Sequence, residues 1–319
     1  MAGWQVHHLD VKSAFLNGEI QEEVYVVQPP GFDCACEEEK VFRLSKALHA
    51  LCQAPRAWNI KLDDTLVSLG FQRSPSEHVV YMRCDVGERL LLGVYVDDLV
   101  VTGSSTEAIA WFKKQIQSVF SMSDLGLPSY YLGIDVHQGT EAITLKHPEL
   151  RVQIQEGEPE PQLVGYSDAD IAGDIYHRKS TSGTVFVFGG SAISWQSQKQ
   201  KVITLSSCEA EYIAATTAAC TGVWLRQMLG DLLVDPGSGT PLLIDKKSAI
   251  QLCKNPVFHD RTKHIETRFH FIRECVQEGR ITVDYVHTGE QLADIMTKAL
   301  PRAKFQELRE KLGMIDISR

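Results

Sequence analysis

The sequence lacks any apolar run close to the roughly 20 residues that a membrane-spanning helix needs, so we expect no membrane contact. It also lacks the basic and then apolar order of a signal peptide, so we expect a protein that is not secreted. The eight cysteines are scattered, and the one close pair, Cys34 and Cys36, has no second pair at metal-site spacing. We therefore expect reduced thiols, no zinc site, and a cytoplasmic or nuclear location.

A surplus of basic residues is missing too, because 32 Lys and Arg stand against 41 Asp and Glu, a net charge of −9. The charges are unevenly distributed. Residues 1–150 carry 12 basic and 20 acidic residues, whereas residues 151–319 carry 20 and 21, with a basic cluster between Lys254 and Arg280. Since nucleic acid is bound through local basic patches, the second half is the better candidate for such contact.

Length and turn residues predict two domains. The segment "QEGEPEPQ" at residues 155–162 interrupts every periodic pattern, so we expect one domain over 1–150, a linker over 151–162 and a second domain over 163–319. In the first domain, the mixture of strand and helix signals indicates an α+β fold. Its segment 54–71 predicts a helix with these core residues: Ala57, Ile60, Leu62, Leu66 and Leu69.

The second domain has clearer signals for a mixed sheet with helices packed on it. Segments 163–170, 181–190 and 192–198 predict three successive strands. A helix follows, opened by a capping box of Ser206 and Glu209. One stripe of this helix has an acid at its N-terminal end followed by small and apolar residues: Glu211, Ala215, Ala218, Gly222, Leu225 and Leu229. A short strand at 241–245, a helix at 262–276, a strand over 281–289 and a helix from about Gln291 complete the α/β pattern.

Four acids of this domain stand at element ends: Asp168, Glu211, Asp245 and Asp294. Acids gathered at one rim of a sheet repel one another unless cations neutralise them, and two divalent ions about 3.5–4 Å apart would do so and activate water. For any one acid alone, a helix N-cap or an exposed carboxylate is the simpler interpretation. His287 is either a carrier of a proton at this site or an exposed histidine.

The second half resembles the ribonuclease H domain of copia-type retrotransposon polyproteins. The matching stretches are "GYSDADIAGD", "HRKSTSG", "ISWQSQKQ", "LSSCEAEYIAA", "IDKKSAIQL", "NPVFHDRTKHIETRFHFIRE" and "QLADIMTKAL". The resemblance implies an α/β ribonuclease H-like domain in which Asp168, Glu211, Asp245 and Asp294 ligate metal. It also implies an RNA/DNA hybrid as substrate, with Lys263 and Arg268 against its phosphates.

The first half resembles the reverse transcriptase palm of the same polyproteins, through "HHLDVKSAFLNGEIQEEVYVVQPPGF", "RLSKALHALCQAPRAWN" and "YVDDLVVTG". The resemblance implies that Asp10 and Asp97 ligate catalytic metal and that Asp98 supports them. Phe15 would exclude a ribose 2′-hydroxyl, and Gln53 would touch the incoming nucleotide. An RNA template and a DNA primer are the partners that this half implies.

Departures from the family pattern bear on function. The chain starts nine residues before Asp10 and joins the two halves with roughly 25 residues, so we expect the fingers, thumb and connection of a polymerase to be missing. Lys246 stands where the family has a short polar residue, and it could pair with Asp245.

Three interpretations follow from the sequence. The first is a palm-like fragment without polymerase activity, followed by a ribonuclease H that cuts RNA in hybrids with Mg²⁺ or Mn²⁺, two ions per active site. The second is a working reverse transcriptase. The third is a non-catalytic remnant that binds nucleic acid or has no role. The oligomeric state is not predicted.

Overall fold

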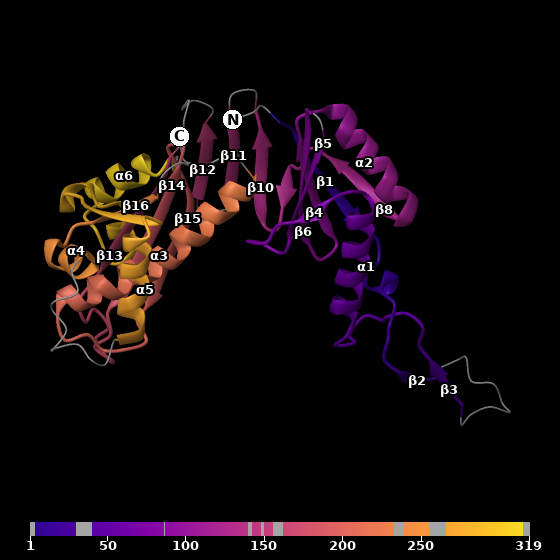
Figure 1. Ribbon diagram of the computed structural model, residues 1–319, viewed down its shortest axis with the longest axis horizontal. Coiled ribbons are helices and arrows are strands. Elements are labelled where there is room, and N and C mark those ends of the chain that lie inside the picture. Colours follow the sequence, from indigo (N-terminus) through magenta and orange to yellow (C-terminus); the bar gives the residue numbers. More distant parts are fainter. Residues whose placement is uncertain are drawn as a thin grey trace. The chain divides into compact units, whose positions relative to one another are not determined.

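The computed structural model describes residues 4–29, 40–85, 87–139, 142–147, 150–155, 162–232, 239–254 and 266–314. At 142, 147, 150–155 and 266–270 it describes the backbone alone. The chain forms two compact units, an N-terminal unit within Ala2–Pro128 and a C-terminal unit within Ser129–Arg319 (Figure 1). Each unit is considered by itself.

The N-terminal unit is an α+β layer structure, as its sequence predicts. Its elements in chain order are β1 (Val6–Val11), η1 (Ala14–Asn17), β2 (Tyr25–Val27), β3 (Val41–Arg43), α1 (Ala54–Ser68), β4 (Gln72–Arg73), β5 (Val80–Asp85), β6 (Glu88–Tyr95), β7 (Asp98–Gly103), α2 (Thr106–Val119) and β8 (Met122–Gly126). Six strands form one sheet in the order β4-β5-β6-β7-β1-β8, and every pairing in it is antiparallel. β2 and β3 form a separate two-stranded sheet.

Both long helices of this unit pack on one face of the six-stranded sheet. Leu9 of β1 and Leu99 of β7 are fully buried in the cluster that holds α1 and α2. One expected core residue is wrong: Ile60 of α1 is 42% exposed. Trp58 takes the inward position instead, because its indole is buried and donates a hydrogen bond to the backbone oxygen of Val96. Ile60 follows Trp58 by two positions, so its side chain is rotated about 200° around the helix axis and faces solvent.

The C-terminal unit contains two sheets. Its elements in chain order are β9 (Tyr130–Tyr131), β10 (Ile134–Gln138), β11 (Ala142–His147), β12 (Leu150–Gln155), β13 (Leu163–Ala169), β14 (Thr181–Phe188), β15 (Ser191–Lys199), α3 (Ser207–Leu232), β16 (Thr240–Ile244), α4 (Lys247–Lys254), α5 (Glu266–Gln277), β17 (Ile281–Tyr285), η4 (Thr288–Glu290), η5 (Leu292–Met296) and α6 (Arg302–Lys311). The smaller sheet has the order β12-β11-β10-β9.

The division of the chain differs from the expected one. The two compact units separate between Pro128 and Ser129 rather than at residue 150, and residues 150–155 of the expected linker form β12. The reason is that β12 pairs with β11 and also contacts β15, which joins the four-stranded sheet to the C-terminal unit. Residues 156–161 of the expected linker lie outside the described residues.

The larger sheet of this unit is mixed, in the order β15-β14-β13-β16-β17. β14 is antiparallel to both β13 and β15, whereas β16 runs parallel to both β13 and β17. A mixed sheet of this order, with helices between its parallel strands, confirms the expected α/β ribonuclease H-like class. The parallel pairing brings the carboxyl ends of β13 and β16 to the same edge.

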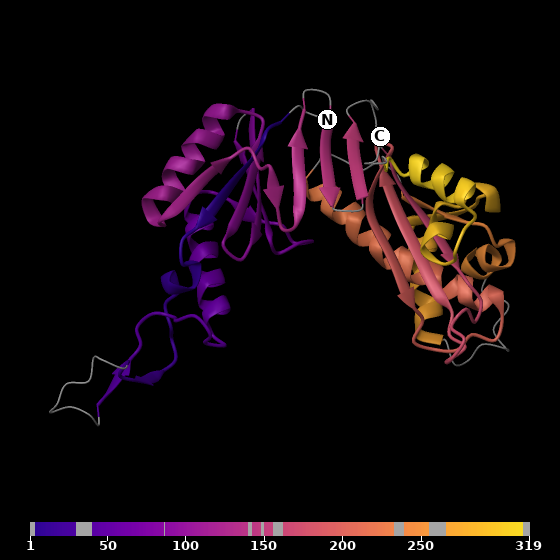
Figure 2. The ribbon, with the colours of Figure 1, turned by 180° about the vertical axis from the view of Figure 1, so that it is seen from behind.

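Helices cover both faces of the mixed sheet (Figures 1 and 2). α3 packs with α4 and α5 around Phe186, while Val185, the preceding residue of β14, packs with η5 and α6 on the other face. The predicted stripe of α3 is buried along its length, and a side-chain carbon on Gly222 would lie 3.1 Å from Phe186. Small residues on this stripe therefore let the helix lie close to the sheet.

The predicted capping box opens α3. The amide of Glu209 donates to Ser206 Oγ at 3.2 Å, and the Glu209 carboxylate accepts from the amide of Leu205 at 2.7 Å. Among the helices that the structure describes, none combines the length and the apolar character that crossing a bilayer requires.

Candidate active site

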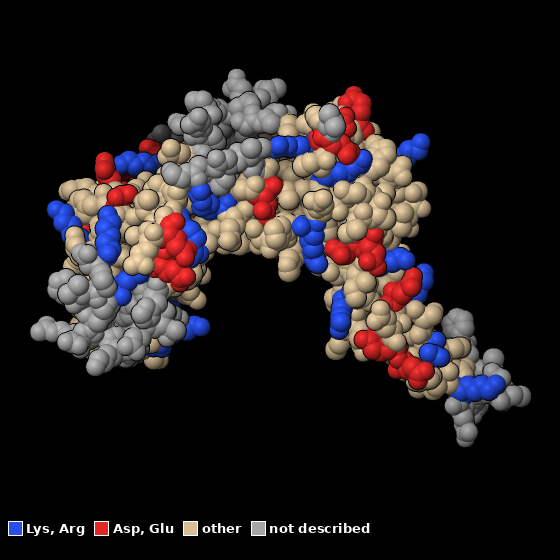
Figure 3. Space-filling model, viewed as in Figure 1, with Lys and Arg blue, Asp and Glu red and all other residues tan. Residues whose placement is uncertain are grey.

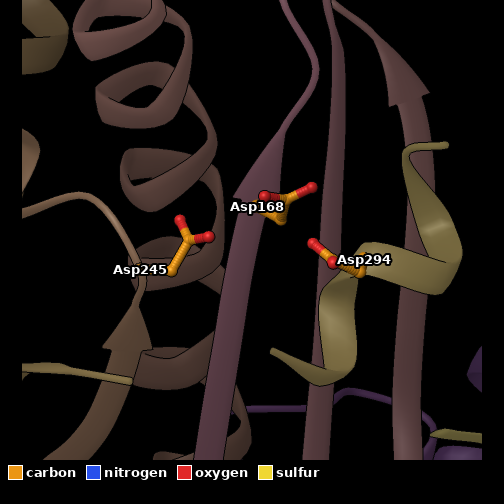
Figure 4. A group of neighbouring side chains, drawn as sticks. All are labelled: Asp168, Asp245 and Asp294. Atoms are coloured by element: carbon orange, nitrogen blue, oxygen red, sulfur yellow. The ribbon is translucent and has the colours of Figure 1, made fainter. Parts of the chain in front are cut away.

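Three of the four predicted acids of the C-terminal unit meet at the edge of the mixed sheet. Asp168 lies on β13, Asp245 directly follows β16, and Asp294 lies in η5. One carboxylate oxygen from each lies within 4.8 Å of the others, and Figure 4 shows Asp168 between the other two. Asp168 and Asp294 are buried, whereas Asp245 is partly exposed. We name these three residues the carboxylate cluster.

A glycine lets η5 bring its acid to the cluster. Gly183 of β14 is paired directly with Asp168 of β13. A side-chain carbon on Gly183 would lie 2.6 Å from Thr297 Cγ2 and 2.8 Å from the backbone oxygen of Ala293, which is too close for either. A glycine inside a strand often marks such a close approach of another backbone. The absence of a side chain here therefore permits η5 to lie over the strand pair that carries Asp168.

The segment that follows β17 supplies a partner to each member of the cluster. Thr288 Oγ1 donates to Asp245 Oδ2 at 2.9 Å, and Thr297 Oγ1 donates to Asp168 Oδ2. Lys298 places its ammonium group 2.8 Å from Asp294 Oδ1 and 3.8 Å from Asp168 Oδ2. These partners were not predicted. The spacing of Lys298, four residues after Asp294, is the one signal in the sequence that pointed to an ion pair.

Glu211 lies beside the cluster but is not part of the set whose oxygens come within 4.8 Å. It is buried near the start of α3, and in the described part of the chain its Oε2 has no hydrogen-bond partner. Burial, and then the charges of Asp168 and Asp245, raise the pKa of Glu211 to about 9. A neutral acid is thus the favoured form of Glu211 at pH 7 when no metal ion is bound.

Burial is also the main reason that the pKa of Asp168 rises to about 6, and the charges of Asp294 and Asp245 act in the same direction. The hydroxyl of Thr297 and the charge of Lys298 oppose this shift. For Lys298, burial lowers the pKa, but pairing with Asp294 and the nearby carboxylates raise it by more. The lysine is therefore a permanent cation beside the cluster.

These residues fit a divalent-cation site. Oxygen atoms of carboxylates are the ligands that Mg²⁺ and Mn²⁺ prefer. Two of the three acids in the cluster are buried, and a fourth acid beside it holds an oxygen without a partner among the described residues. Burying like charges together costs free energy unless a cation compensates them, and the raised pKa of Glu211 expresses that cost.

Two further residues of this unit bear on the expected site. His287 is exposed, and its Nδ1 accepts a hydrogen bond from the amide of Gly289, so this nitrogen caps η4. His287 is not in the carboxylate cluster. Lys246 forms no ion pair with Asp245 among the residues described, so the expected pairing is not found.

The expected contacts with phosphates fall where no side chain is described. Lys263 lies outside the described residues, and Arg268 belongs to the part of α5 whose backbone alone is described. Their roles stay predictions.

In the N-terminal unit, the backbone of strand β1 at Asp10 lies beside the backbone of Asp97 and Asp98. Asp10 of β1 is paired directly with Asp98 of β7, and the amide of Val11 donates to the backbone oxygen of Asp97 at 2.9 Å. Asp98 Oδ1 lies 2.6 Å from His8 Nε2. Among the described residues, these acids do not form a set of three with ligand atoms within 4.8 Å of one another.

The acidic pair stands at a tight hairpin turn. Tyr95 pairs with Asp98, so Val96 and Asp97 form a two-residue loop between β6 and β7. Val96 has φ of 56°, a left-handed conformation that favours glycine and that a β-branched residue rarely adopts. The turn is held by the hydrogen bond of 2.6 Å from Trp58 Nε1 to the backbone oxygen of Val96.

The two residues expected to contact nucleotide lie near the start of α1. The ring of Phe15 packs edge-on against His49, with 5.5 Å between ring centroids. Gln53 directly precedes α1 and lines a surface pocket of about 230 Å³ together with Arg56 and Lys61. Their roles stay predictions.

Comparison with known proteins agrees with this arrangement. Residues 1–156 match the family model described as reverse transcriptase (RNA-dependent DNA polymerase). Over 97% of its length the chain is 32% identical to the retrovirus-related Pol polyprotein from transposon TNT 1-94 of Nicotiana tabacum. Over 98% it is 30% identical to the corresponding polyprotein from transposon RE2 of Arabidopsis thaliana. The chain belongs to the copia-type retrotransposon Pol family.

The chain spans about a third of these family members, 31% of the TNT 1-94 polyprotein and 28% of the RE2 polyprotein. The alignment with TNT 1-94 runs over 410 residues and is therefore longer than the 319-residue chain itself. The tobacco polyprotein thus has segments inside the aligned span that this chain lacks, which is the internal shortening expected from the sequence.

Solved structures that align with the chain include two kinds of protein. One is the N-terminal RNase H domain of rv2228c from Mycobacterium tuberculosis, at 14% identity and a TM-score of 0.32, covering 47% of this chain and 97% of that chain. Another is the foamy viral protease-reverse transcriptase in complex with dsDNA, at 12% identity and a TM-score of 0.28, covering 88% and 68%. The fold class follows from the strand order and helix positions of the two units themselves.

Proposed function

We propose that the C-terminal unit is a two-metal ribonuclease H that cleaves the RNA strand of an RNA/DNA hybrid. The observation that carries the proposal is the carboxylate cluster, in which Asp168, Asp245 and Asp294 come within 4.8 Å of one another from three different elements. The family of the chain supports the same substrate class. Glu211 would join these acids once a cation offsets their mutual repulsion.

The residues would divide the work as follows. Asp168, Asp245, Asp294 and Glu211 would hold Mg²⁺ or Mn²⁺, which when bound would polarise water and neutralise the phosphate. The hydroxyls of Thr288 and Thr297 would fix the orientation of Asp245 and Asp168, because each already donates to its carboxylate.

His287 would exchange a proton with the departing product through Nε2. Its Nδ1 is engaged by Gly289, which fixes the direction in which the other nitrogen points.

For the N-terminal unit we propose a palm-like fragment that does not extend a primer by itself. The internal shortening relative to the tobacco polyprotein supports this, since a polymerase must also hold primer, template and triphosphate. The contact between Asp98 and His8 supports it too, because it engages one of the acids expected near the metal.

Cleavage of a hybrid tests the proposal. The full chain is incubated with a hybrid whose RNA strand is labelled, with Mg²⁺, with Mn²⁺ and with EDTA, beside an Asp168→Asn variant of equal thermal stability. Metal-dependent cleavage of the RNA strand that is lost in the variant is the expected result. A folded chain that binds the hybrid and leaves it intact under all conditions would instead favour a non-catalytic remnant. The ion pair of Lys298 with Asp294 would be the feature that favours that second candidate.

A further inference from the structure

The loop between β13 and β14, residues 170–180, begins two residues after Asp168 and so stands at the same edge of the sheet as the carboxylate cluster. Hydrogen bonds cross it repeatedly. The amide of Asp170 donates to Thr181 O at 3.1 Å, and the amide of Arg178 donates to Asp174 O at 2.8 Å. The amide of Ala172 donates to Ser180 Oγ at 3.1 Å. The loop therefore has one defined shape beside the proposed active site.

Holding that shape costs conformational free energy. Ala172 has φ of 51° and Arg178 has φ of 55°, left-handed values that are uncommon for residues other than glycine. Strained backbone persists only where neighbouring contacts impose it, and it concentrates at ligand-binding sites.

The loop carries an exposed aromatic ring and basic side chains. The side chain of Tyr176 is 90% exposed, and Arg178 is also exposed. Lys199 and Lys201 add two cations at the end of β15, which lies beside the loop because the amide of Gln200 donates to Ser180 O.

The two acids of the loop differ: Asp170 Oδ1 accepts a hydrogen bond from the amide of Thr181, whereas Asp174 pairs with cations. Asp174 pairs with Lys199 at 2.6 Å and with His177 at 2.9 Å, and its side chain is only 10% exposed. Over the described ranges, no acidic group forms an ion pair with Arg178, Lys179 or Lys201. The loop and the adjoining end of β15 therefore carry three basic side chains with no ion-pair partner among the described residues, beside one such acid, Asp170, although the whole chain carries a net charge of −9.

Charge decides between two classes of partner. Ile203 and Leu205, which are 55% and 80% exposed on the neighbouring segment, would suit a protein. A polyanion suits the three cations better. On the face of the molecule that Figure 3 shows, basic and acidic side chains lie intermixed.

We propose that this surface binds a nucleic-acid strand beside the carboxylate cluster. Arg178, Lys179 and Lys201 contact consecutive phosphates, and Tyr176 stacks on an unpaired base where the strand leaves the hybrid. Every base has a π-face, so this contact is independent of sequence. The inference rests on the proposed function for the identity of the adjacent site, but it concerns binding and not cleavage.

Fluorescence anisotropy in EDTA tests the proposal, since binding is then measured without cleavage. The full chain is titrated with a blunt RNA/DNA hybrid and with the same hybrid carrying a single-stranded extension. The test variant is Tyr176→Ala with Arg178→Gln. The control variant, Phe305→Ala with Lys311→Gln on α6, also removes one exposed ring and one cation. Thermal melting confirms that both variants are folded.

We expect the test variant to lose at least tenfold in affinity for the extended hybrid, the control less than twofold. The preference of the chain for the extended over the blunt hybrid should disappear with Tyr176→Ala alone. The salt dependence of binding should weaken by about one phosphate contact when Arg178 is replaced.

Equal affinities of the test and control variants would overturn the proposal, as would a chain that binds neither hybrid. A test variant that binds the hybrid as tightly as the unchanged chain does, but has lost the binding of a protein at the loop surface, would indicate a protein partner and would also overturn the proposal. Loop-dependent binding by a chain that never cleaves the hybrid would uphold this inference and remove the proposed function. A chain that cleaves the hybrid, with an affinity that the loop substitutions leave unchanged, would uphold the proposed function and overturn this inference.

Discussion

The ammonium group of Lys298 lies 2.8 Å from Asp294 Oδ1, a carboxylate oxygen of the cluster that would bind a metal ion. Its second carboxylate neighbour, Asp168, is 3.8 Å away. In the absence of metal the lysine thus supplies the compensating charge, and a cation that binds the same oxygens competes with it.

Replacing Lys298 by Gln should act in opposite directions on stability and on metal affinity. Without metal the variant should melt several degrees lower, because the buried acids lose their counter-charge. Its affinity for Mn²⁺ should rise at least about fivefold, since the repulsion between two unit charges 4 Å apart is about 1 kcal/mol even with the screening of water. Calorimetric titration of Mn²⁺ and thermal melting of the metal-free chain measure the two effects.

Lys254→Gln is the matched control. Its side chain is 45% exposed against 42% for Lys298, and its ion pair with Asp284 is long, at 3.9 Å. It should leave both measurements unchanged. Loss of Mn²⁺ affinity in Lys298→Gln would show that the lysine supports the metal site rather than competing with it.

The raised pKa values of two acids predict how stability depends on pH. The pKa of Asp168 is about 6 and that of Glu211 about 9, both above their values in an unfolded chain. The folded chain therefore binds more protons than the unfolded chain between about pH 4 and pH 9. Without metal, the melting temperature should fall steadily as the pH rises through this window.

Two comparisons check the origin of that slope. Millimolar Mg²⁺ should remove most of it, because the metal binds the ionised carboxylates of the folded state. Glu211→Gln should flatten the part above pH 6. A metal-free chain whose melting temperature rises between pH 5 and pH 9 would contradict the arrangement of these acids.

Gly183→Ala should disturb the site through packing alone. The added carbon would lie 2.6 Å from Thr297 Cγ2, so η5 must move away from the strand that carries Asp168. We expect a loss of about 1–3 kcal/mol in the free energy of unfolding, and weaker Mn²⁺ binding by the folded variant. Urea unfolding and metal titration measure these effects.

Gly93→Ala on β6 serves as the control, since nothing lies within 4 Å of its added carbon. Unchanged metal affinity in a destabilised Gly183→Ala variant would mean that η5 keeps Asp294 in place by other contacts.

Val96→Gly should stabilise the hairpin that carries the acidic pair of the N-terminal unit. Glycine adopts φ of 56° without the steric cost that valine has there, and the expected gain is about 1 kcal/mol. Hydrogen exchange at the amide of Val11, which is bonded to Asp97 O, reports on this hairpin. Val101→Gly, in the buried centre of β7, should instead destabilise the unit. Faster exchange in Val96→Gly would contradict the interpretation of the turn as strained.

Much of the C-terminal unit was predictable because its signals are local. The ends of β13 and β16 could be read from short apolar runs, each of which ends beside an acid. The capping box of Ser206 and Glu209 marked the start of α3. Acids at strand ends then had to approach one another, because parallel strands bring their carboxyl ends to one edge.

The remainder depends on contacts between distant segments. Nothing local to Thr288 or Thr297 indicates that their hydroxyls reach Asp245 and Asp168, because the path of the chain after β17 decides it. The boundary at residue 150 failed for a related reason. Pro and Glu residues mark a break in secondary structure, but the pairing of β12 with β11 and its contact with β15 decide to which unit the strand belongs.

The measurement that tests the central claim most directly is the chemistry of the cut in the labelled RNA strand. Attack by a metal-activated water leaves no 2′,3′-cyclic phosphate, whereas attack by the 2′-hydroxyl of the RNA itself does. We predict Mg²⁺-dependent products without cyclic phosphate from the full chain on an RNA/DNA hybrid, and none from Asp168→Asn. Cyclic phosphate ends, cleavage in EDTA, or equal cleavage by Asp168→Asn would contradict the account.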